Sequence, residues 1–244
     1  MDELIVTLDT DWAPDFAIDF AAEQLRAHRV CATWLITHHS PAIERLRQDP
    51  ELFELGIHPN FLPGSTHGGS PDAVLRHCLS IVPEARSLRT HALVQSTELL
   101  EQIMRTTPIT VDASLFLPHA AGLRPVEHHW AGRMLLRIPY CWEDDFEMER
   151  TRPAWHLDEL LRDGEGMRVF DFHPIHVWLN SAARGPYETL KTREGALPRL
   201  SPEHAEAHVQ QGDGTRTMFL EVLGHLASTG RSRCLRDLVG APSR

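Results

Sequence analysis

Short apolar runs alternate with longer amphipathic stretches along the chain. The short runs predict β-strands, and the stretches with apolar residues three and four positions apart predict α-helices. This alternation is typical of β/α units around a mostly parallel sheet, and no repeat or shift in composition marks a second domain, so we expect one domain over residues 1–244. Strands are predicted at 4–8, 31–36, 53–57, 87–90, 109–111, 134–138 and 167–172. Helices are predicted at 15–28, after Pro41, from Ser70 onward, and at 96–105, 157–162, 202–210 and 215–227.

Polar residues stand where most of the predicted strands end. In parallel α/β sheets and barrels, the carboxyl ends of the strands converge on one face, where active sites are built. We therefore expect acids, histidines and an arginine to meet at that face. The segments concerned are Asp9-Thr-Asp11, His58-Pro-Asn60, Arg89-Thr-His91, Asp112 and Asp171-Phe-His173.

Composition and charge exclude several classes of protein. Of the 244 residues, 42% are hydrophobic and 24% charged, which is an ordinary globular mixture. The net charge is −10 and the basic residues form no cluster, which disfavours nucleic acid as a partner. The apolar runs fall far short of the roughly 20 residues that cross a bilayer. The first residues carry neither a basic n-region nor an apolar h-region, so a cytoplasmic location is predicted.

Cysteine and histidine usage narrows the chemistry further. The four cysteines are widely separated and form no C-x-x-C pair, so we expect buried free thiols rather than a thiolate zinc site. There are 16 histidines against 2 tyrosines, and several of the histidines stand at the ends of apolar runs. An excess of histidine at strand ends indicates a metal site.

Asp9 and Asp11 lie two residues apart directly after the first predicted strand. Because side chains alternate along a strand, both carboxylates can point to the same side, where they repel each other. A divalent cation removes this repulsion and leaves one carboxylate free to act as a base. An equally good interpretation is that one aspartate caps the following turn.

Two histidines are candidate ligands to such a cation. His58 follows the third strand and precedes Pro59, which keeps the chain extended toward the face of the site. His67 lies in the glycine-rich loop 63–69, which can fold back toward His58. Histidine nitrogens and a carboxylate make the three-ligand set of a catalytic zinc site. A solvated loop histidine explains His67 nearly as well.

The last predicted strand supplies a candidate acid. Asp171 and His173 share one face of the strand, so one can donate a proton while the other orients it. Arg89 is a permanent cation that can hold Asp9 ionised, although a surface ion pair explains it about as well. Asp145, in the acidic turn Glu143-Asp-Asp145, is a candidate contact for sugar hydroxyls or, equally, part of a solvated turn. Trp12, Trp34 and Trp178 suit either sugar stacking or the core.

These segments resemble the metal-dependent polysaccharide deacetylases of the NodB-homology, carbohydrate esterase class. The resemblance runs from Thr7-Leu-Asp-Thr-Asp-Trp12 to Phe172-His-Pro-Ile-His-Val-Trp-Leu-Asn180 and covers most of the chain. The segments 56–64, 112–118 and 137–145 are similar to a cytoplasmic subgroup associated with O-antigen and other surface-polysaccharide gene clusters. The resemblance implies a distorted (β/α)₇ barrel.

The resemblance also implies a role for each matching residue. Asp9 matches the catalytic base, Asp11 and His58 match metal ligands, Arg89 matches the arginine that positions the base, and His173 matches the general acid. Where the family has a second histidine ligand this chain has Leu62, and we take His67 as the substitute. Thr10 splits the usual Asp-Asp pair, His91 stands where the family has proline, and Asp171 stands where it has leucine.

The activity implied is hydrolysis of an N-acetyl group on an amino sugar of a glycan precursor. The resemblance implies one divalent ion, with zinc favoured and manganese, cobalt or nickel also compatible. Asp145 and Trp12 are the candidate substrate contacts. Two alternatives stay open, namely a hydrolase of another small amide and an inactive barrel that binds glycan or a partner enzyme.

Overall fold

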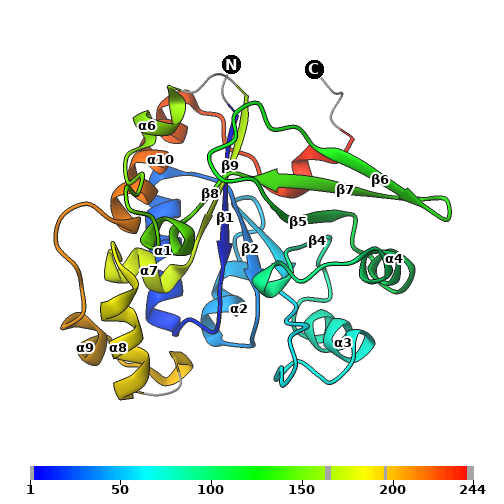
Figure 1. The fold of residues 1–244 in the computed structure, drawn as a ribbon, viewed down its shortest axis with the longest axis horizontal. Coiled ribbons are helices and arrows are strands. Elements are labelled where there is room, and N and C mark those ends of the chain that lie inside the picture. Colours follow the sequence, from blue (N-terminus) through cyan, green and yellow to red (C-terminus); the bar gives the residue numbers. More distant parts are fainter. Residues whose placement is uncertain (1–2, 163–165, 195–196, 241–244) are drawn as a thin grey trace.

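A computed structural model describes residues 3–162, 166–194 and 197–240 (Figure 1). Its strands are β1 (Glu3–Asp9), β2 (Ala32–Ile36), β3 (Phe53–Ile57), β4 (Ser87–Leu88), β5 (Val111–Phe116), β6 (Val126–Trp130), β7 (Arg133–Tyr140), β8 (Trp142–Glu143) and β9 (Met167–Phe172). Its α-helices are α1 (Asp15–His28), α2 (Pro41–Arg47), α3 (Pro71–Ile81), α4 (Thr97–Thr106), α5 (Asp144–Met148), α6 (Leu157–Leu161), α7 (Pro174–Leu179), α8 (Arg184–Glu194), α9 (Pro202–Glu206) and α10 (Thr215–Thr229). Short 3₁₀ turns are η1 (His91–Leu93), η2 (Leu197–Arg199) and η3 (Leu235–Leu238).

The sheet closes on itself through one interrupted strand. Its order is β6-β7-β5-β4-β3-β2-β1-β9-β8, and all neighbouring strands are parallel except β6 with β7. Only Cys141 separates β7, which pairs with β5, from β8, which pairs with β9. The Cys141 amide donates to the Val169 carbonyl at 3.0 Å across this junction. β6 is an antiparallel strand at the edge of the sheet and is not part of the barrel. β7 and β8 together form one interrupted strand of the barrel. The described strands therefore make a seven-stranded barrel, which confirms the distorted (β/α)₇ fold.

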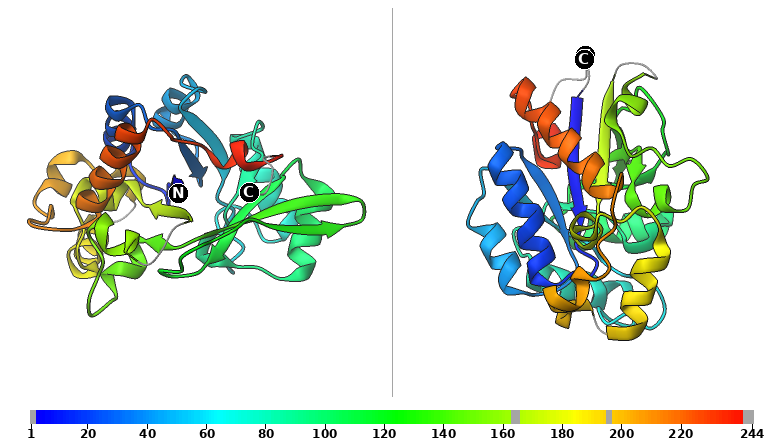
Figure 2. Two further views of the ribbon diagram at one scale, coloured as in Figure 1. Left: turned by 90° about the horizontal axis from the view of Figure 1, so that it is seen from above. Right: turned by 90° about the vertical axis from the view of Figure 1, so that its left-hand side faces the viewer.

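Helix starts follow from local sequence. Ser40, Ser70 and Ser96 each accept a hydrogen bond from the backbone amide three residues later, at 3.2–3.4 Å, and so satisfy an amide that lacks a helical partner. Proline follows Ser40 and Ser70, where the missing N–H costs nothing. Helices α1, α2 and α10 lie outside the ring of strands (Figure 2).

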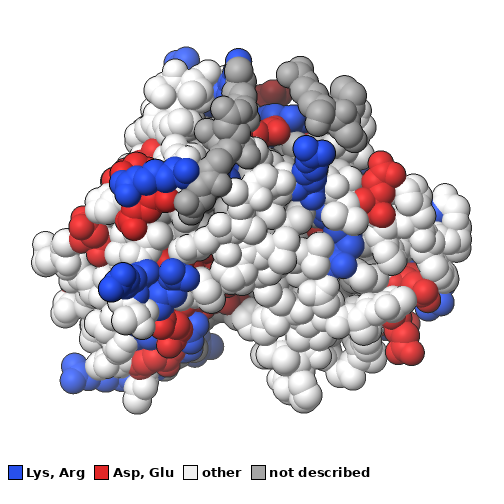
Figure 3. All heavy atoms as spheres, turned by 45° about the horizontal axis from the view of Figure 1, so that its top comes forward, with Lys and Arg blue, Asp and Glu red and all other residues white. Residues whose placement is uncertain are grey.

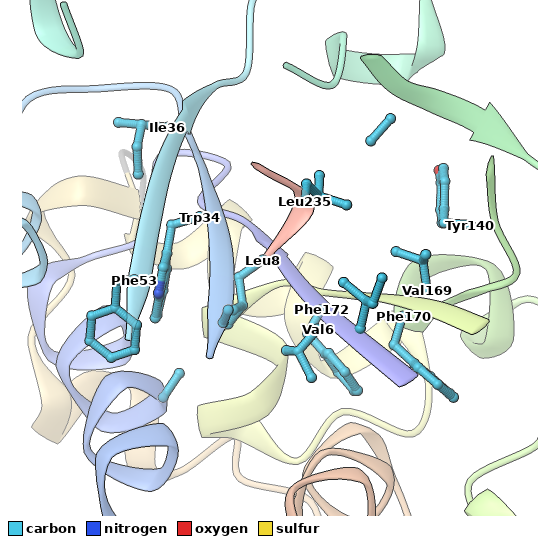
Figure 4. Close-up of a cluster of buried hydrophobic side chains, with 14 of the residues drawn as sticks. Val6, Leu8, Trp34, Ile36, Phe53, Tyr140, Val169, Phe170, Phe172 and Leu235 are labelled. Carbon is cyan, nitrogen blue, oxygen red and sulfur yellow. The ribbon is translucent and has the colours of Figure 1, made fainter. Parts of the chain in front are cut away.

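Side-chain alternation divides each strand between two environments. On β1, Val6 and Leu8 face outward and are fully buried under the helices, while Thr7 and Asp9 face the inside of the barrel. Phe172 of β9 packs against Phe219 of α10 with ring centroids 5.0 Å apart. Figure 4 shows this apolar layer continuing across neighbouring strands. Burial of this layer fixes the register of the strands and therefore the inward direction of the polar residues.

The amino end of the barrel is filled by η3. Leu235 is fully buried among the strands (Figure 4), and its amide donates to Thr33 Oγ1 at 2.9 Å. The Arg236 amide donates to Glu54 Oε2 at 2.8 Å, and Thr33 Oγ1 donates to the same oxygen at 2.8 Å. Because this end is filled, the site that opens to solvent is expected at the carboxyl end.

Several predicted elements need correction. The polar segment that forms β6 was not expected as a strand, because it lacks an apolar alternation, and the two-residue β8 is too short to recognise. Helices α5, α7 and α8 were also missed. Asp112 was expected after the fifth strand, but it lies inside β5 and pairs with Arg137 at 2.7 Å. The fifth strand, predicted at 109–111, overlaps β5 only at Val111, and the helix predicted at 202–210 ends at Glu206. The remaining strands and helices were predicted close to their observed bounds.

Further expectations concern membrane spans, surface charge and the cysteines. In the part of the chain that the structure describes, no helix combines the length and apolarity needed to span a bilayer. On the face shown in Figure 3, acidic and basic side chains are interspersed. All four cysteines are free, and Cys78, Cys141 and Cys234 are buried, as predicted.

Candidate active site

Arg89 joins several inward-facing groups beneath the carboxyl face of the barrel. It follows β4 and is 1% exposed. Its Nη1 donates to Asp9 Oδ1 at 2.9 Å and also to Asp171, while Nη2 donates to Thr7 Oγ1 at 3.0 Å and Nε to the Ala113 carbonyl at 3.0 Å. The guanidinium therefore has a partner on every nitrogen. It fixes Asp9 through one carboxylate oxygen and leaves the other, Oδ2, facing the site.

Asp11, His58 and His91 form a compact triangle at the mouth of the barrel. His58 Nε2 lies 3.1 Å from Asp11 Oδ1 and 3.2 Å from His91 Nδ1, and His91 Nδ1 lies 3.2 Å from the same Asp11 oxygen. Three ligands at about 2.1 Å from a tetrahedral zinc ion would be about 3.4 Å apart, close to these spacings. Two imidazole nitrogens and a carboxylate also suit zinc chemically. The donor set therefore fits a divalent cation.

His67 lies near this triangle but is not part of it. Its ring centroid is 5.3 Å from that of Trp12, and the ring of His91 also lies 5.4 Å from Trp12. His67 Nδ1 accepts a hydrogen bond from the Asn60 amide at 3.1 Å and lies 3.4 Å from Cys78 Sγ. Burial, and after it the nearby His77, lowers the pKa of His67 to about 4. Among the described residues, three groups of side chains could hold a metal ion, and the group at the mouth of the barrel includes His91 while none of the three includes His67.

His173 stands beside the triangle with one ring nitrogen held from behind. Its Nδ1 pairs with Asp144 Oδ1 at 2.7 Å, and its backbone amide donates to Asp144 Oδ2 at 2.8 Å. Its Nε2 points toward Asp11 Oδ2, at 3.6 Å. Burial alone would lower the pKa of His173, but the carboxylates of Asp144, Asp145 and Asp11 outweigh burial and hold the pKa well above its usual value. These carboxylates favour the protonated ring, whose Nε2 faces the site.

Asp171 does not orient His173 in the way the sequence suggested. It is fully buried and accepts hydrogen bonds from Thr7 Oγ1 at 2.9 Å and from Arg89. Burial raises the pKa of Asp171 well above its usual value, although the Arg89 charge opposes this. Asp171 thus shares the guanidinium with Asp9, and Asp144 takes the role of orienting the histidine.

The acidic segment at the start of α5 is part of the site. The Tyr140 hydroxyl donates to Glu143 Oε2 at 3.2 Å, and burial raises the pKa of Glu143 to about 7 despite the opposing charge of His173. Asp145 Oδ1 lies 3.1 Å from Nε2 of the buried His176, and its Oδ2 lies 3.1 Å from Arg184 Nη2. The solvated-turn interpretation is therefore wrong for these groups, which are paired beside His173.

Comparisons with known proteins show the family of the chain. Residues 6–191 match the model of a family described as WbmS-like polysaccharide deacetylases. The chain belongs to this polysaccharide deacetylase family. A crystal structure from Bordetella bronchiseptica, of a putative polysaccharide deacetylase involved in O-antigen biosynthesis, is 33% identical with a TM-score of 0.75. That match covers 91% of this chain and 90% of the other.

More distant structures share only the fold with this deacetylase-family chain. A putative polysaccharide deacetylase from Mycobacterium smegmatis is 15% identical, with a TM-score of 0.52 over 96% of this chain and 93% of the other. A peptidoglycan N-acetylglucosamine deacetylase is 11% identical, with a TM-score of 0.53 over 97% and 87%. The comparison with curated protein sequences gave no match.

Two residues of the candidate site were not singled out by sequence reasoning. His91 stood in the expected polar segment after β4 and was noted only as a departure from proline. Asp144 stands in the acidic segment Glu143-Asp-Asp145, of which only Asp145 was predicted to belong to the site. For His91 the available signal was its position two residues after Arg89 at a strand end. For Asp144 no signal in the sequence distinguishes it from its neighbours.

Proposed function

We propose that the chain is a metal-dependent hydrolase that removes an N-acetyl group from an amino sugar in a surface-polysaccharide precursor. The observation that carries this proposal is the placement of a fixed carboxylate and a cationic imidazole beside one candidate cation group. Carboxylate oxygens of Asp9 and Asp171 and a ring nitrogen of His173 all lie within 4.8 Å of one another, and Asp9 Oδ2 lies 3.5 Å from His58 Nδ1. An O-antigen-type precursor is favoured by the 33% identity to the Bordetella protein.

We assign the cation to Asp11, His58 and His91. A divalent ion held there would act as a Lewis acid: it would lower the pKa of the attacking water and polarise the amide carbonyl. Zinc suits the mixed imidazole and carboxylate set, while manganese, cobalt or nickel also fit. His91 takes the position that the sequence had assigned to His67.

The chain's own groups supply the proton transfers. Asp9 Oδ1 is bonded to Arg89, so Oδ2 accepts the proton of the attacking water. His173 keeps Nδ1 on Asp144, so Nε2 donates a proton to the departing amine, which is otherwise a poor leaving group. No covalent bond to the enzyme is needed. The C–N bond breaks to give acetate and the amine, after which Asp9 releases the proton that it took from water to solvent and His173 takes up a proton from solvent.

The test is acetate release from a panel of N-acetylated amino sugars and sugar nucleotides, run beside amine release from simple amides. Acetate release from a sugar, lost on metal removal and restored by zinc, supports the proposal. Faster hydrolysis of simple amides would favour the small-amide alternative. An absence of tightly held metal and of any hydrolysis would favour a binding module. The cytoplasmic location stays a prediction.

A further inference from the structure

The chain that leads into η3 runs beside the start of β2, at the amino end of the barrel. The Cys31 amide donates to Ser232 Oγ at 3.0 Å, and the Leu235 amide donates to Thr33 Oγ1 at 2.9 Å. Cys234 stands between these two contacts and is fully buried, whereas Cys31 is partly exposed. Hydrogen bonds on both sides of Cys234 therefore hold it against the strand that begins next to Cys31.

The sulfur atoms of these two cysteines lie in one small region. Cys31 Sγ is 3.7 Å from the Glu51 carbonyl oxygen, and Cys234 Sγ is 3.6 Å from the carbonyl oxygen of the next residue, Leu52. Cys234 Sγ is also 3.4 Å from the carbonyl oxygen of Ala32. The Cys234 thiol is placed to donate to Cys31 Sγ as well. Two sulfurs so close need little movement to form a disulfide.

The two thiols differ in reactivity. The hydrogen bond from Cys234, and after it that from Ser232, lowers the pKa of Cys31 to about 6 against the opposing effect of burial. The same contact, together with burial, raises the pKa of Cys234 well above its usual value. The thiolate is the nucleophilic form of cysteine, and Cys31 is also the more accessible of the two. Cys31 is therefore suited to attack first and Cys234 to follow.

The other two cysteines lack this arrangement. Burial raises the pKa of Cys78 to about 12 and that of Cys141 to about 11. Cys78 Sγ lies 3.4 Å from His67 Nδ1, and Cys141 Sγ lies 3.6 Å from the Val169 carbonyl oxygen. Both thiols are thus protonated at neutral pH and covered, so they serve as internal controls.

We propose that Cys31 and Cys234 form a reversible disulfide by exchange with a low-molecular-weight disulfide, and that this bond ties η3 to β2. The Cys31 thiolate attacks one sulfur of the small disulfide, whose S–S bond breaks and releases one small thiolate. Cys234 loses its proton to solvent and attacks the Cys31 sulfur of the mixed disulfide, which releases the second small thiolate. The two protein thiols lose two electrons and two protons, and the small disulfide is reduced to two thiols.

The bond joins positions 31 and 234, which are far apart in the sequence, at the end of the barrel that η3 fills. It touches none of the groups assigned to the reaction at the carboxyl end, so its expected effect is on stability. In a reducing compartment such a bond is transient and forms when the supply of small disulfides rises. The proposal does not depend on the proposed function.

The first test maps the bond in the whole protein. The reduced chain is incubated with oxidised glutathione at rising ratios to reduced glutathione, the remaining thiols are alkylated, and trypsin is added without reductant. Cleavage after Arg233 and Arg236 leaves Cys234 in a three-residue peptide, and Cys31 falls in peptide 30–45. We expect these two peptides to be joined, and to separate on treatment with dithiothreitol. Absence of the joined peptide at every ratio would overturn the proposal.

The second test separates the two roles. Cys234→Ser should stop at a glutathione adduct on Cys31, Cys31→Ser should form neither adduct nor bond, and the matched control Cys78→Ser should form the bond as the parent does. Circular dichroism checks that each variant folds, and the map of the parent protein stands without them. An equally fast adduct on Cys234 in Cys31→Ser would overturn the order of attack. A bond formed with hydrogen peroxide but never with oxidised glutathione would overturn the exchange route.

The third test measures the tie between η3 and β2. A disulfide that closes a long loop restricts the unfolded chain, so the oxidised protein should melt about 4–10 °C above the reduced protein. Cys31→Ser treated in the same way should show no rise, and Cys78→Ser should show the full rise. A linked protein that melts at the temperature of the reduced form would overturn the tie.

Discussion

The two ends of the barrel use polar groups in opposite ways. At the amino end, Thr33 and the amides of η3 bond to one another and to Glu54 Oε2 around the fully buried Leu235. At the carboxyl end, acids and imidazoles lie close together around the buried Arg89, and His58 Nδ1 and Asp171 Oδ2 have no hydrogen-bond partner in the described part of the chain. The polar groups of the amino end therefore hold η3 in place. The carboxyl end keeps acidic groups close together, an arrangement that a bound cation would relieve.

The largest expected effect tests the carboxyl end. Asp9→Asn removes the proton acceptor while keeping the hydrogen bond to Arg89, so acetate release should fall by about a hundred- to ten-thousand-fold. Circular dichroism and metal content should match the parent protein. Unchanged acetate release would mean that another residue is the base.

The corresponding change at the amino end should affect stability alone. Leu235→Ala leaves a cavity at a fully buried position, and we expect the free energy of unfolding to fall by about 2–5 kcal/mol. Urea denaturation measures this loss, with Leu220→Ala on the exposed face of α10 as the control, expected within about 0.5 kcal/mol. A large drop in kcat/KM for folded Leu235→Ala would contradict the separation of the two ends.

A matched pair of histidine variants tests the assignment of the metal ligands. His91→Ala removes one donor of the triangle and should weaken zinc binding by at least about a hundredfold in chelator competition. His67→Ala should keep one zinc per chain and instead loosen the loop, which limited proteolysis would detect. The reverse result would restore His67 as the ligand.

The smallest effect concerns pH. The pKa of His173 is raised in the folded protein, so its ionic contacts stabilise the fold fully below the unfolded pKa of 6.5, and this contribution is lost as pH rises through the folded pKa. The same deprotonation removes the acid and sets the alkaline limit of activity. Asp144→Asn removes a carboxylate that raises the pKa, so that limit should move to lower pH. An unshifted pH profile would contradict the role of Asp144.

The apolar pattern that burial imposes on β1, β3 and β9 predicted a mostly parallel α/β sheet and the face on which the site lies, and the family resemblance implied the barrel. Asp9, Asp11, His58, Arg89 and His173 were also placed together, since each follows or ends a buried strand. The partners of these residues were harder to find. His67 and His91 both follow strands within a short distance, and only the fold of the loop shows that His67 bonds to Asn60.

Asp144 illustrates a different limit. Glu143, Asp144 and Asp145 are consecutive acids whose side chains point in different directions. Those directions depend on the pairing of β8 with β9, which local sequence does not reveal. Asp171 likewise stands two residues from His173. Asp171 lies in β9 and contacts Arg89, whereas His173 follows the strand and contacts Asp144. Such contacts depend on distant segments of the chain, so local pattern cannot specify them.

The lone residue between β7 and β8 links closure of the barrel to the acid chemistry. β7 bonds to β5 and β8 bonds to β9, so the single residue Cys141 sets the register of β8 relative to β7. Removing it would shift the following segment by one position and turn each of its side chains to the opposite surface. Asp144 would then leave His173. Lengthening or shortening the chain at this point is therefore incompatible with keeping the proton donor in place, whereas the turn between β6 and β7 can vary in length without that effect.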